Sequence, residues 1–264
     1  MSDLCTVKKS TLDGIAEAIQ SKTGESGGML PSEMKGKIED LPSQPAKGLV
    51  FSEYDSEGYP HKAEFVGSWT EIPAGYADGV FSRSLIMGKN VSALAIPEGV
   101  TVIQNSAIRG IHFTPTLPST LVTLNNNCFQ NSTFSSITLP SSLTTINSFA
   151  FQENNSLTSI TFPAGLTTTN QNCFGNCRAL ATVTYLGNVP NISSRQYGNT
   201  PITLFDCSHA TAIPSLYAVN ALDHASGCVI RIPSALSDQT LGAGNGWESA
   251  TNWSGLTNIV WEAV

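Results

Sequence analysis

Leu117-Pro-Ser-Thr-Leu121, Leu139-Pro-Ser-Ser-Leu143 and Phe162-Pro-Ala-Gly-Leu166 are three copies of one short pattern, spaced about 22 residues apart. Earlier and more degenerate copies begin at Ile96-Pro97 and Ile72-Pro73. Self-similarity at a fixed period of this length is typical of a solenoid, in which each unit buries its apolar face against its neighbours. The sequence therefore predicts a stack of short coils through the middle of the chain.

Each copy keeps a fixed set of apolar positions, while the residues between them vary among Ser, Thr and Asn. An apolar residue follows the Leu-Pro pattern at Leu124 and Ile146, and Thr169 breaks this rule in the next copy. A small residue and a phenylalanine then form a pair in each copy: Cys128-Phe129, Ala150-Phe151 and Cys173-Phe174. Because these positions are constant, we expect them to form the core. Each Phe should stack on its counterpart one coil away, and its burial should contribute roughly 2 to 3 kcal/mol.

The end of each copy favours a short β-strand. In Leu157-Thr-Ser-Ile-Thr-Phe162, the β-branched residues and the short apolar spacing suit a strand. Pro163 then ends the pairing because proline has no backbone N–H to donate. We therefore expect one short strand per copy and a parallel sheet along the solenoid.

The copies resemble the leucine-rich repeats of bacterial surface proteins. That pattern runs Leu-Pro-x-x-Leu-x-x-Ile-x-x-x-Ala-Phe and leads into a Leu-x-x-Ile strand, and Ile108 and Thr169 depart from it. The resemblance implies a mainly β fold, a leucine-rich-repeat solenoid of short parallel strands over residues 72–190. Taken alone, it also implies a bacterial surface protein.

Two further segments flank the repeats. Residues 46–71 predict a β-hairpin linker around the acidic turn Asp55–Gly58. Residues 191–264 keep traces of the strand-then-proline pattern and add the large apolar residues Trp247 and Trp253. Because a solenoid needs its open end covered, we interpret this last segment as a C-terminal cap with terminal repeats.

The first 45 residues predict a leader of two short amphipathic helices. Leu12, Ile15 and Ile19 fall on one face of the first helix, and Met34 and Ile38 fall on one side of the second. Helices this short need a partner surface for their apolar stripes. We therefore expect these five side chains to dock on another protein.

The sequence of the leader suggests what that protein is. Ser10-Thr-Leu-Asp-Gly-Ile-Ala-Glu-Ala-Ile19, Lys22-Thr-Gly24 and Met29-Leu-Pro-Ser-Glu-Met34 resemble the N-terminal leader of tail and baseplate proteins from phages and prophages of gut Firmicutes. The resemblance implies a chain that is made in the bacterial cytoplasm and assembled into a virion tail. Its implied partners are other tail or baseplate proteins.

Charge and hydropathy argue against two kinds of partner, nucleic acid and the membrane. The chain of 264 residues carries 13 Lys and Arg against 20 Asp and Glu, for a formal net charge of −7, whereas a nucleic-acid partner requires a basic stripe. Between Gly110 and Asp206 the charged residues are Glu153, Arg178 and Arg195 alone. No apolar run approaches the roughly 20 residues of a membrane span. We therefore expect neither nucleic-acid binding nor membrane insertion.

No constellation of residues predicts catalysis. Gly24-Glu-Ser-Gly-Gly28 satisfies the nucleophile-elbow pattern, but that motif needs a preceding strand and a His and an acid held by a core. The four histidines and six cysteines show no metal-ligand spacing. We therefore expect no catalytic residue, no metal and no cofactor. Disulfide pairing among Cys177, Cys207 and Cys228 stays open.

The strand pattern leaves a surface for binding. Because side chains alternate along a strand, pairs of hydroxyls should point out of the core on adjacent coils. These pairs are Ser136 and Thr138, Ser159 and Thr161, and Thr182 and Thr184. Tyr185 and Tyr197, near the end of this ladder, are the expected aromatic contacts. Such a neutral face can hydrogen-bond a glycan or a protein on a host surface.

Together these features predict a non-enzymatic phage or prophage tail protein whose solenoid attaches to the host surface. Tail symmetry would suit a homotrimer or a ring. The alternative is a cell-surface adhesin of a gut bacterium, which predicts an export signal that Met1–Lys9 does not resemble. A glycan-degrading tail enzyme would need paired carboxylates, and Glu153 has no acidic partner in the repeats.

Overall fold

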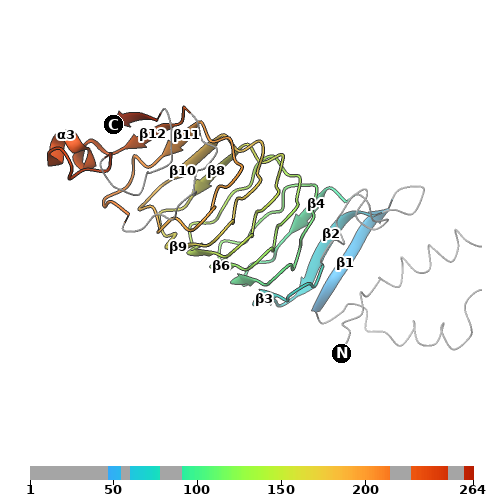
Figure 1. Cartoon of the computed structure of the whole chain (residues 1–264). Coiled ribbons are helices and arrows are strands. Elements are labelled where there is room, and N and C mark those ends of the chain that lie inside the picture. Colours follow the sequence, from blue (N-terminus) through green and yellow to red (C-terminus); the bar gives the residue numbers. More distant parts are fainter. Residues whose placement is uncertain (1–46, 55–59, 78–90, 215–226, 249–258) are drawn as a thin grey trace, which may run out of the picture.

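The structure is a computed structural model, and it describes residues 47–54, 60–77, 91–214, 227–248 and 259–264. Figure 1 shows an elongated stack of coils made of short strands, with a hairpin at its N-terminal end and a short helical segment at its C-terminal end. The mainly β solenoid of parallel strands predicted from the repeat is confirmed. The predicted docking residues Leu12, Ile15, Ile19, Met34 and Ile38 lie outside the described residues, as does Trp253.

The hairpin is joined to the solenoid through a shared sheet. Strands β1 (Lys47–Tyr54) and β2 (Pro60–Gly67) pair antiparallel on either side of the predicted acidic turn. Strand β2 also pairs in parallel with β4 (Ala93–Ala95), which belongs to an early coil. Alternate residues of the hairpin are buried in the core, namely Leu49, Phe51, Ala63 and Phe65. The hairpin therefore extends the stack at its N-terminal end.

A sheet of two-residue strands, here called the narrow sheet, runs along one side of the solenoid. Its strands pair in parallel in the order β3 (Glu71–Ile72), β5 (Val102–Ile103), β6 (Thr123–Leu124), β7 (Thr145–Ile146) and β9 (Thr168–Thr169). The second residue of each strand is buried. The expectation of one strand per copy was therefore wrong for the later coils. Two residues are too short for an alternating pattern to reveal a strand.

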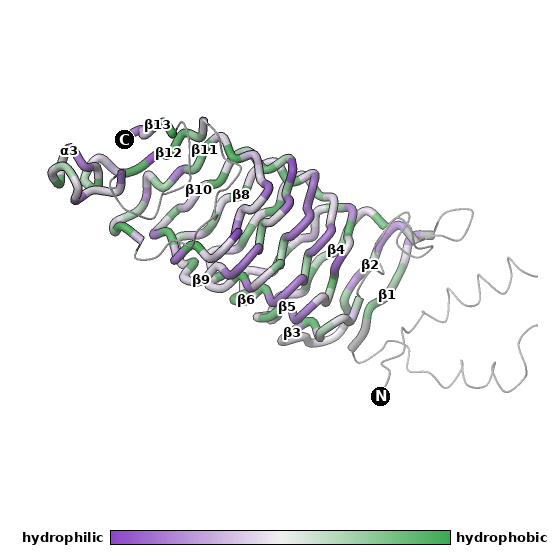
Figure 2. The backbone as a smooth tube through the Cα atoms, viewed as in Figure 1, coloured by the Kyte–Doolittle hydropathy of each residue, from purple (hydrophilic) through white to green (hydrophobic). Residues whose placement is uncertain are grey.

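A second parallel sheet, here called the wide sheet, has longer strands. Its order is β8 (Ser159–Phe162), β10 (Thr182–Tyr185), β11 (Leu204–Asp206), β12 (Val229–Ile232) and β13 (Val260–Ala263). The sheet thus continues beyond residue 190, into the segment predicted as a cap. In β8, β10 and β12 the second and fourth residues are buried, and the first and third point outward. Figure 2 shows the matching alternation of hydrophobic and hydrophilic residues along the coils.

A column of stacked aromatic rings fills the interior. The ring centroids of Phe129 and Phe151 are 5.5 Å apart, and those of Phe151 and Phe174 are 5.0 Å apart, with interplanar angles of 22° and 7°. This confirms the stack predicted from the small-plus-aromatic pairs. Tyr197 continues the column, 5.7 Å from Phe174. The four rings are buried.

A compact turn follows β12 near the C-terminal end of the described residues. A 3-10 turn, η1 (Ser234–Leu236), leads into the four-residue helix α3 (Asp238–Leu241). Trp247 is fully buried in the core, and its backbone N–H donates to the carbonyl of Leu236 at 3.0 Å. A side chain at Gly246 would collide with the backbone of Asp238, so this tight return requires glycine.

A ladder of side-chain hydrogen bonds follows the narrow sheet from coil to coil. Gln104 Nε2 donates to Glu71 Oε2 at 2.8 Å, and Asn125 Nδ2 donates to Gln104 Oε1 at 2.7 Å. Asn147 and Asn170 continue the series, each donating to the residue of the preceding coil at 2.7 Å. Each amide thus offers its N–H to one neighbour and its oxygen to the next, and the ladder holds successive coils in register.

Replacing Asn147 with alanine should lower the free energy of unfolding by about 1 to 2 kcal/mol. The change removes two part-buried hydrogen bonds and leaves the Asn170 amide and the Asn125 oxygen without this partner. Urea denaturation measures the effect. The exposed Asn155 of the same coil serves as control, and its alanine variant should stay within about 0.5 kcal/mol. Equal losses in the two variants would contradict a structural role for the ladder.

Candidate recognition surface

The outward residues of the wide sheet form two columns, fixed by the strand register. One column begins with Ser159 and Thr182, and the other begins with Thr161 and Thr184. Ser159 and Thr161 are exposed, and Thr182 and Thr184 are half-buried. In the preceding coil Ser136 and Thr138 are exposed on either side of the buried Ile137, although no strand forms there. The six predicted hydroxyl residues therefore point out of the core on three successive coils.

Over the last three strands of the wide sheet, the two columns hold aliphatic and charged residues in place of serine and threonine. The first continues through the aliphatic residues Leu204, Val229 and Val260, and Val260 is 55% exposed. The second continues through three charged residues: Asp206, Arg231 and Glu262. The face is thus neutral over β8 and β10, and it pairs an aliphatic column with an ionic column over β11, β12 and β13.

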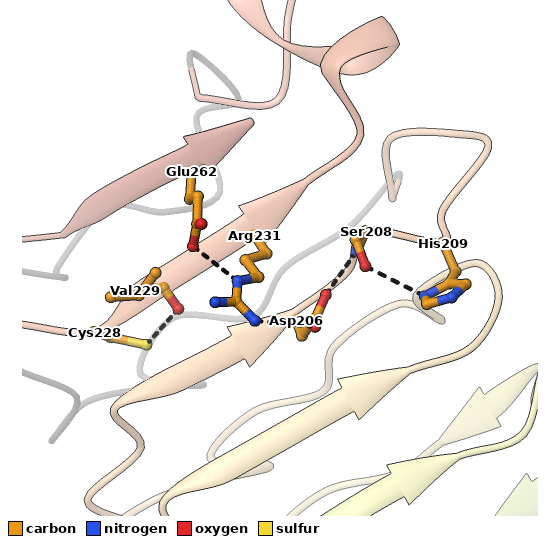
Figure 3. Close-up of polar contacts among 7 residues, drawn as sticks. All are labelled: Asp206, Ser208, His209, Cys228, Val229, Arg231 and Glu262. Carbon is orange, nitrogen blue, oxygen red and sulfur yellow. Dashed lines mark hydrogen bonds and ion pairs between the residues drawn. The ribbon is translucent and has the colours of Figure 1, made fainter. Parts of the chain in front are cut away.

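The ionic column links three strands. Arg231 Nε donates to Glu262 Oε2 at 2.7 Å, and its Nη1 lies 3.8 Å from Asp206 Oδ2 (Figure 3). The hydrogen bond with Glu262 raises the pKa of the Arg231 guanidinium above its usual value. With two acids and one base, the column carries one net negative charge. Sequence reasoning did not find this column.

A serine, a histidine and an aspartate lie at or just after the end of β11, but their contacts are not those of a catalytic triad. Ser208 Oγ lies 3.3 Å from His209 Nδ1, and the Ser208 backbone N–H donates to Asp206 Oδ1 at 3.0 Å (Figure 3). In a triad the carboxylate accepts from the imidazole. Here the Asp206 carboxylate faces the Ser208 backbone and Arg231 instead. Asp206 therefore orders the turn after β11.

The described part of the chain has neither a metal-binding cluster nor a membrane-spanning helix. No group of three or more His, Cys, Asp and Glu side chains there is placed to hold a metal ion. Of the helices in those residues, none is long and apolar enough to cross a membrane.

The two tyrosines predicted to contact a receptor are buried, so that prediction was wrong. Tyr185 is 1% exposed and Tyr197 is fully buried, and their hydroxyl oxygens lie 2.7 Å apart. Tyr185 occupies an inward position of β10, in register with Phe162. Tyr197 stands 23 positions after Phe174, which is the period of the ring column. Counting that period would have placed Tyr197 in the core.

A buried polar network surrounds these tyrosines and explains why Thr169 breaks the apolar rule. Thr169 Oγ1 donates to Gln196 Oε1 at 2.9 Å, and Gln196 Nε2 donates to the Tyr185 hydroxyl at 3.3 Å. The Ser193 backbone N–H also donates to Gln196 Oε1, at 3.2 Å. Gln196 fills the slot that holds a small residue in earlier coils. Thr169 and Gln196 are therefore two halves of one interaction, and desolvation raises the pKa of both tyrosines.

The five described cysteines are free thiols in the interior: Cys128, Cys173, Cys177, Cys207 and Cys228. Burial raises the pKa of the Cys177 thiol to about 12 and that of Cys228 to about 11. A thiol stays protonated below its pKa, and the thiolate is the reactive form. These side chains act as small core residues.

At pH 8 the folded protein should therefore resist alkylation at these five cysteines, because they are both buried and protonated. In urea all five should react with iodoacetamide, at least about 100-fold faster than in the folded state. Mass spectrometry of the cysteine-containing peptides gives the labelled fraction at each site. Rapid labelling in the folded state, or a disulfide that joins Cys177, Cys207 or Cys228, would contradict this arrangement.

Comparison with known proteins identifies the repeat. Residues 81–203 match the family described as BspA type leucine rich repeat region, in six copies. No curated protein matches the chain.

Among solved structures, the chain is similar to a leucine-rich repeat protein from Bacteroides ovatus, at 14% identity and a TM-score of 0.38, over 81% of this chain and 75% of that one. It is also similar to a leucine rich cell surface protein from Faecalibacterium prausnitzii, at 18% identity and a TM-score of 0.32, over 75% and 72%. The parallel coils and the family match over residues 81–203 show that the fold is a leucine-rich-repeat solenoid.

Proposed function

We propose that this chain is a non-enzymatic recognition protein that contacts a glycan or a protein on a cell surface through the outer face of the wide sheet. The observation that carries the proposal is the pair of outward columns on that face. Ser159, Thr161, Thr182 and Thr184 offer hydroxyls that both donate and accept hydrogen bonds. No charge must be desolvated over these two strands, so a neutral partner can approach closely.

The ionic column would set the orientation in which a partner binds to the face and would discriminate between partners. Asp206, Arg231 and Glu262 lie at one end of the hydroxyl columns, beside the aliphatic residues of the same strands. A partner that spans the sheet would meet a neutral half and a charged half. Charged groups at the rim of a contact mainly set orientation and association rate.

The place of action that the repeat supports best is the surface of a gut bacterium. The repeat resembles that of bacterial surface proteins, and the BspA-type match is consistent with that resemblance. This was the alternative interpretation of the sequence, and we now put it first.

A second location is a phage or prophage tail. The observation in its favour is the leader-like sequence between residues 8 and 42, which lies outside the described residues. In that setting the leader would dock on other tail or baseplate proteins, and the chain would be a homotrimer or a ring. The face of the wide sheet would have the same task in both settings.

Immunogold electron microscopy distinguishes the two locations. An antibody against residues 91–214 is applied to intact cells that produce the chain and to virions purified from the same culture. Gold on the cell envelope, with bare virions, is the result we expect. Gold at the tail tip with unlabelled envelopes would replace the cell-surface location with the phage one. Label confined to the cytoplasm of sectioned cells would refute a surface role in either form.

A further inference from the structure

Five successive coils each turn through a pair of residues with left-handed backbone, and backbone hydrogen bonds between these turns align them as an edge of the solenoid. The first left-handed position holds Ser106, Asn127, Phe149, Asn172 and Arg195, with φ between 51° and 61°. The second, four residues later, holds Gly110, Asn131, Glu153, Asn176 and Asn199. We call these two columns the turn edge. Asparagine and glycine adopt this conformation readily, whereas a bulky side chain does so at a cost in free energy.

One coil departs from this preference at both positions. Phe149 has a φ of 61° and Glu153 a φ of 64°, while the coils on either side have asparagine at both places. The repeats thus supply an internal comparison in which the backbone is the same and only the side chains differ. A strained conformation that neighbouring coils avoid by using asparagine points to a role outside folding.

Phe149 does not contribute to the core in the way its neighbours do. Ala150 and Phe151 fill the buried pair positions, and Phe151 is fully buried in the ring column. Phe149 is half-buried and lies outside the hydrophobic core cluster. Its ring therefore offers an apolar surface at the turn edge.

The surroundings of this coil are rich in amides. Gln130 Nε2 donates to Gln152 Oε1 at 2.6 Å, and Asn127 Nδ2 donates to Gln130 Oε1 at 3.0 Å. These hydrogen bonds hold the amides in place across adjacent coils, and further donors and acceptors on them remain for a ligand. Glu153 adds a carboxylate, which accepts hydrogen bonds only.

We infer that the turn edge around Phe149 is a binding site for a neutral saccharide. A sugar ring presents an apolar C–H face that can lie against an aromatic ring, and it presents hydroxyls around its rim. The ring of Phe149 would pack against the apolar face of the sugar. Gln130, Gln152 and Glu153 would hydrogen-bond its hydroxyls. A single ring among amides suits a sugar better than a protein, because protein contacts need a larger apolar centre.

This site adds a second contact to the recognition role proposed above and rests on that role. The first test compares the full chain with its Phe149→Asn variant, which restores the residue of both neighbouring coils. Relief of strain should raise the Tm by roughly 2 to 4 °C. At the same time, the affinity for glycans should fall at least about tenfold. A fall in Tm would mean that Phe149 stabilises the fold, and it would overturn the inference.

The second test probes an array of neutral glycans with the full chain, the Phe149→Asn variant and a narrow-sheet variant that combines Thr123→Lys with Thr145→Lys. We expect the wild type and the narrow-sheet variant to bind the same glycans, and the Phe149→Asn variant to lose them. Undiminished array binding by the Phe149→Asn variant would overturn the inference, since the sugar would then lie elsewhere on the chain.

The same three proteins are tested on whole cells, so that this site and the wider role can fail separately. Wild-type chain that binds cells but no array glycan would overturn the saccharide site and leave the recognition role standing. If protease treatment of the cells removes the part of binding that depends on Phe149, the ligand there is a protein and the inference fails. Binding to neither cells nor glycans would refute both proposals.

Discussion

Replacing Phe151 with alanine should lower the free energy of unfolding by about 3 to 5 kcal/mol, the largest single effect that we expect in this chain. Phe151 is fully buried between Phe129 and Phe174, and it also meets the edge of Phe134 with centroids 6.4 Å apart. Truncation would leave a cavity in the middle of the ring column. Because each coil is stabilised by its neighbours, the loss would extend to the coils on both sides.

Urea denaturation followed by circular dichroism measures this effect. The matched control is Phe149→Asn, a change of the same residue type in the same coil but outside the core, and it should cause no loss of stability. If Phe151→Ala costs less than about 1 kcal/mol, the ring column is not the main source of stability in this part of the solenoid.

Replacing Gln196 with alanine should cost roughly 2 to 4 kcal/mol, because buried groups lose their partners. Gln196 Oε1 accepts from both the Thr169 hydroxyl and the Ser193 backbone N–H, and its Nε2 donates to Tyr185. Thr169 and Tyr185 are almost fully buried, so water cannot readily replace the amide. The variant therefore retains a nearly normal shape but leaves polar groups unsatisfied.

A second substitution tests whether this network acts as a unit. Adding Thr169→Ile to Gln196→Ala gives the residue types found at Ile146, one coil before Thr169, and at Ala150, two coils before Gln196. The double variant should be more stable than Gln196→Ala alone, with a coupling of about 0.5 to 3 kcal/mol in a double-mutant cycle. Simple addition of the two single effects would show that Thr169 and Gln196 do not depend on each other.

The core was predictable from the sequence because the repeat keeps its interior residues constant. The positions of Phe129, Phe151 and Phe174 recur at one period, and the structure stacks them as that period predicts. The narrow sheet was not predictable, since two residues carry no alternation to detect. The prediction that Tyr185 and Tyr197 contact a receptor was wrong because both side chains point inward. Tyrosine is common on binding surfaces, although the period places Tyr197 in the ring column.

The candidate surface was predictable only where the period holds. The hydroxyl columns follow from the alternation in β8 and β10, where Thr161 and Thr184 are 23 positions apart. The ionic column has no such signal, because Asp206 and Arg231 are 25 positions apart and Arg231 and Glu262 are 31 apart. Their alignment depends on strand register that sequence spacing does not reveal. The turn edge was also not predictable from the sequence. The free-energy cost of a left-handed backbone at Phe149 is recognised only when its φ is compared with that of Asn127 and Asn172.

Binding of the fluorescently labelled full chain to cells tests the central claim most directly. Flow cytometry on a panel of gut bacterial isolates and intestinal epithelial cells compares the wild type with two double variants. One is the wide-sheet variant, Thr161→Lys with Thr184→Lys, and the other places the same charges on the narrow sheet, Thr123→Lys with Thr145→Lys. We predict that the wild type and the narrow-sheet variant bind, and that the wide-sheet variant binds at least about tenfold less. Equal binding by the two variants would contradict the assignment of the wide sheet as the recognition surface.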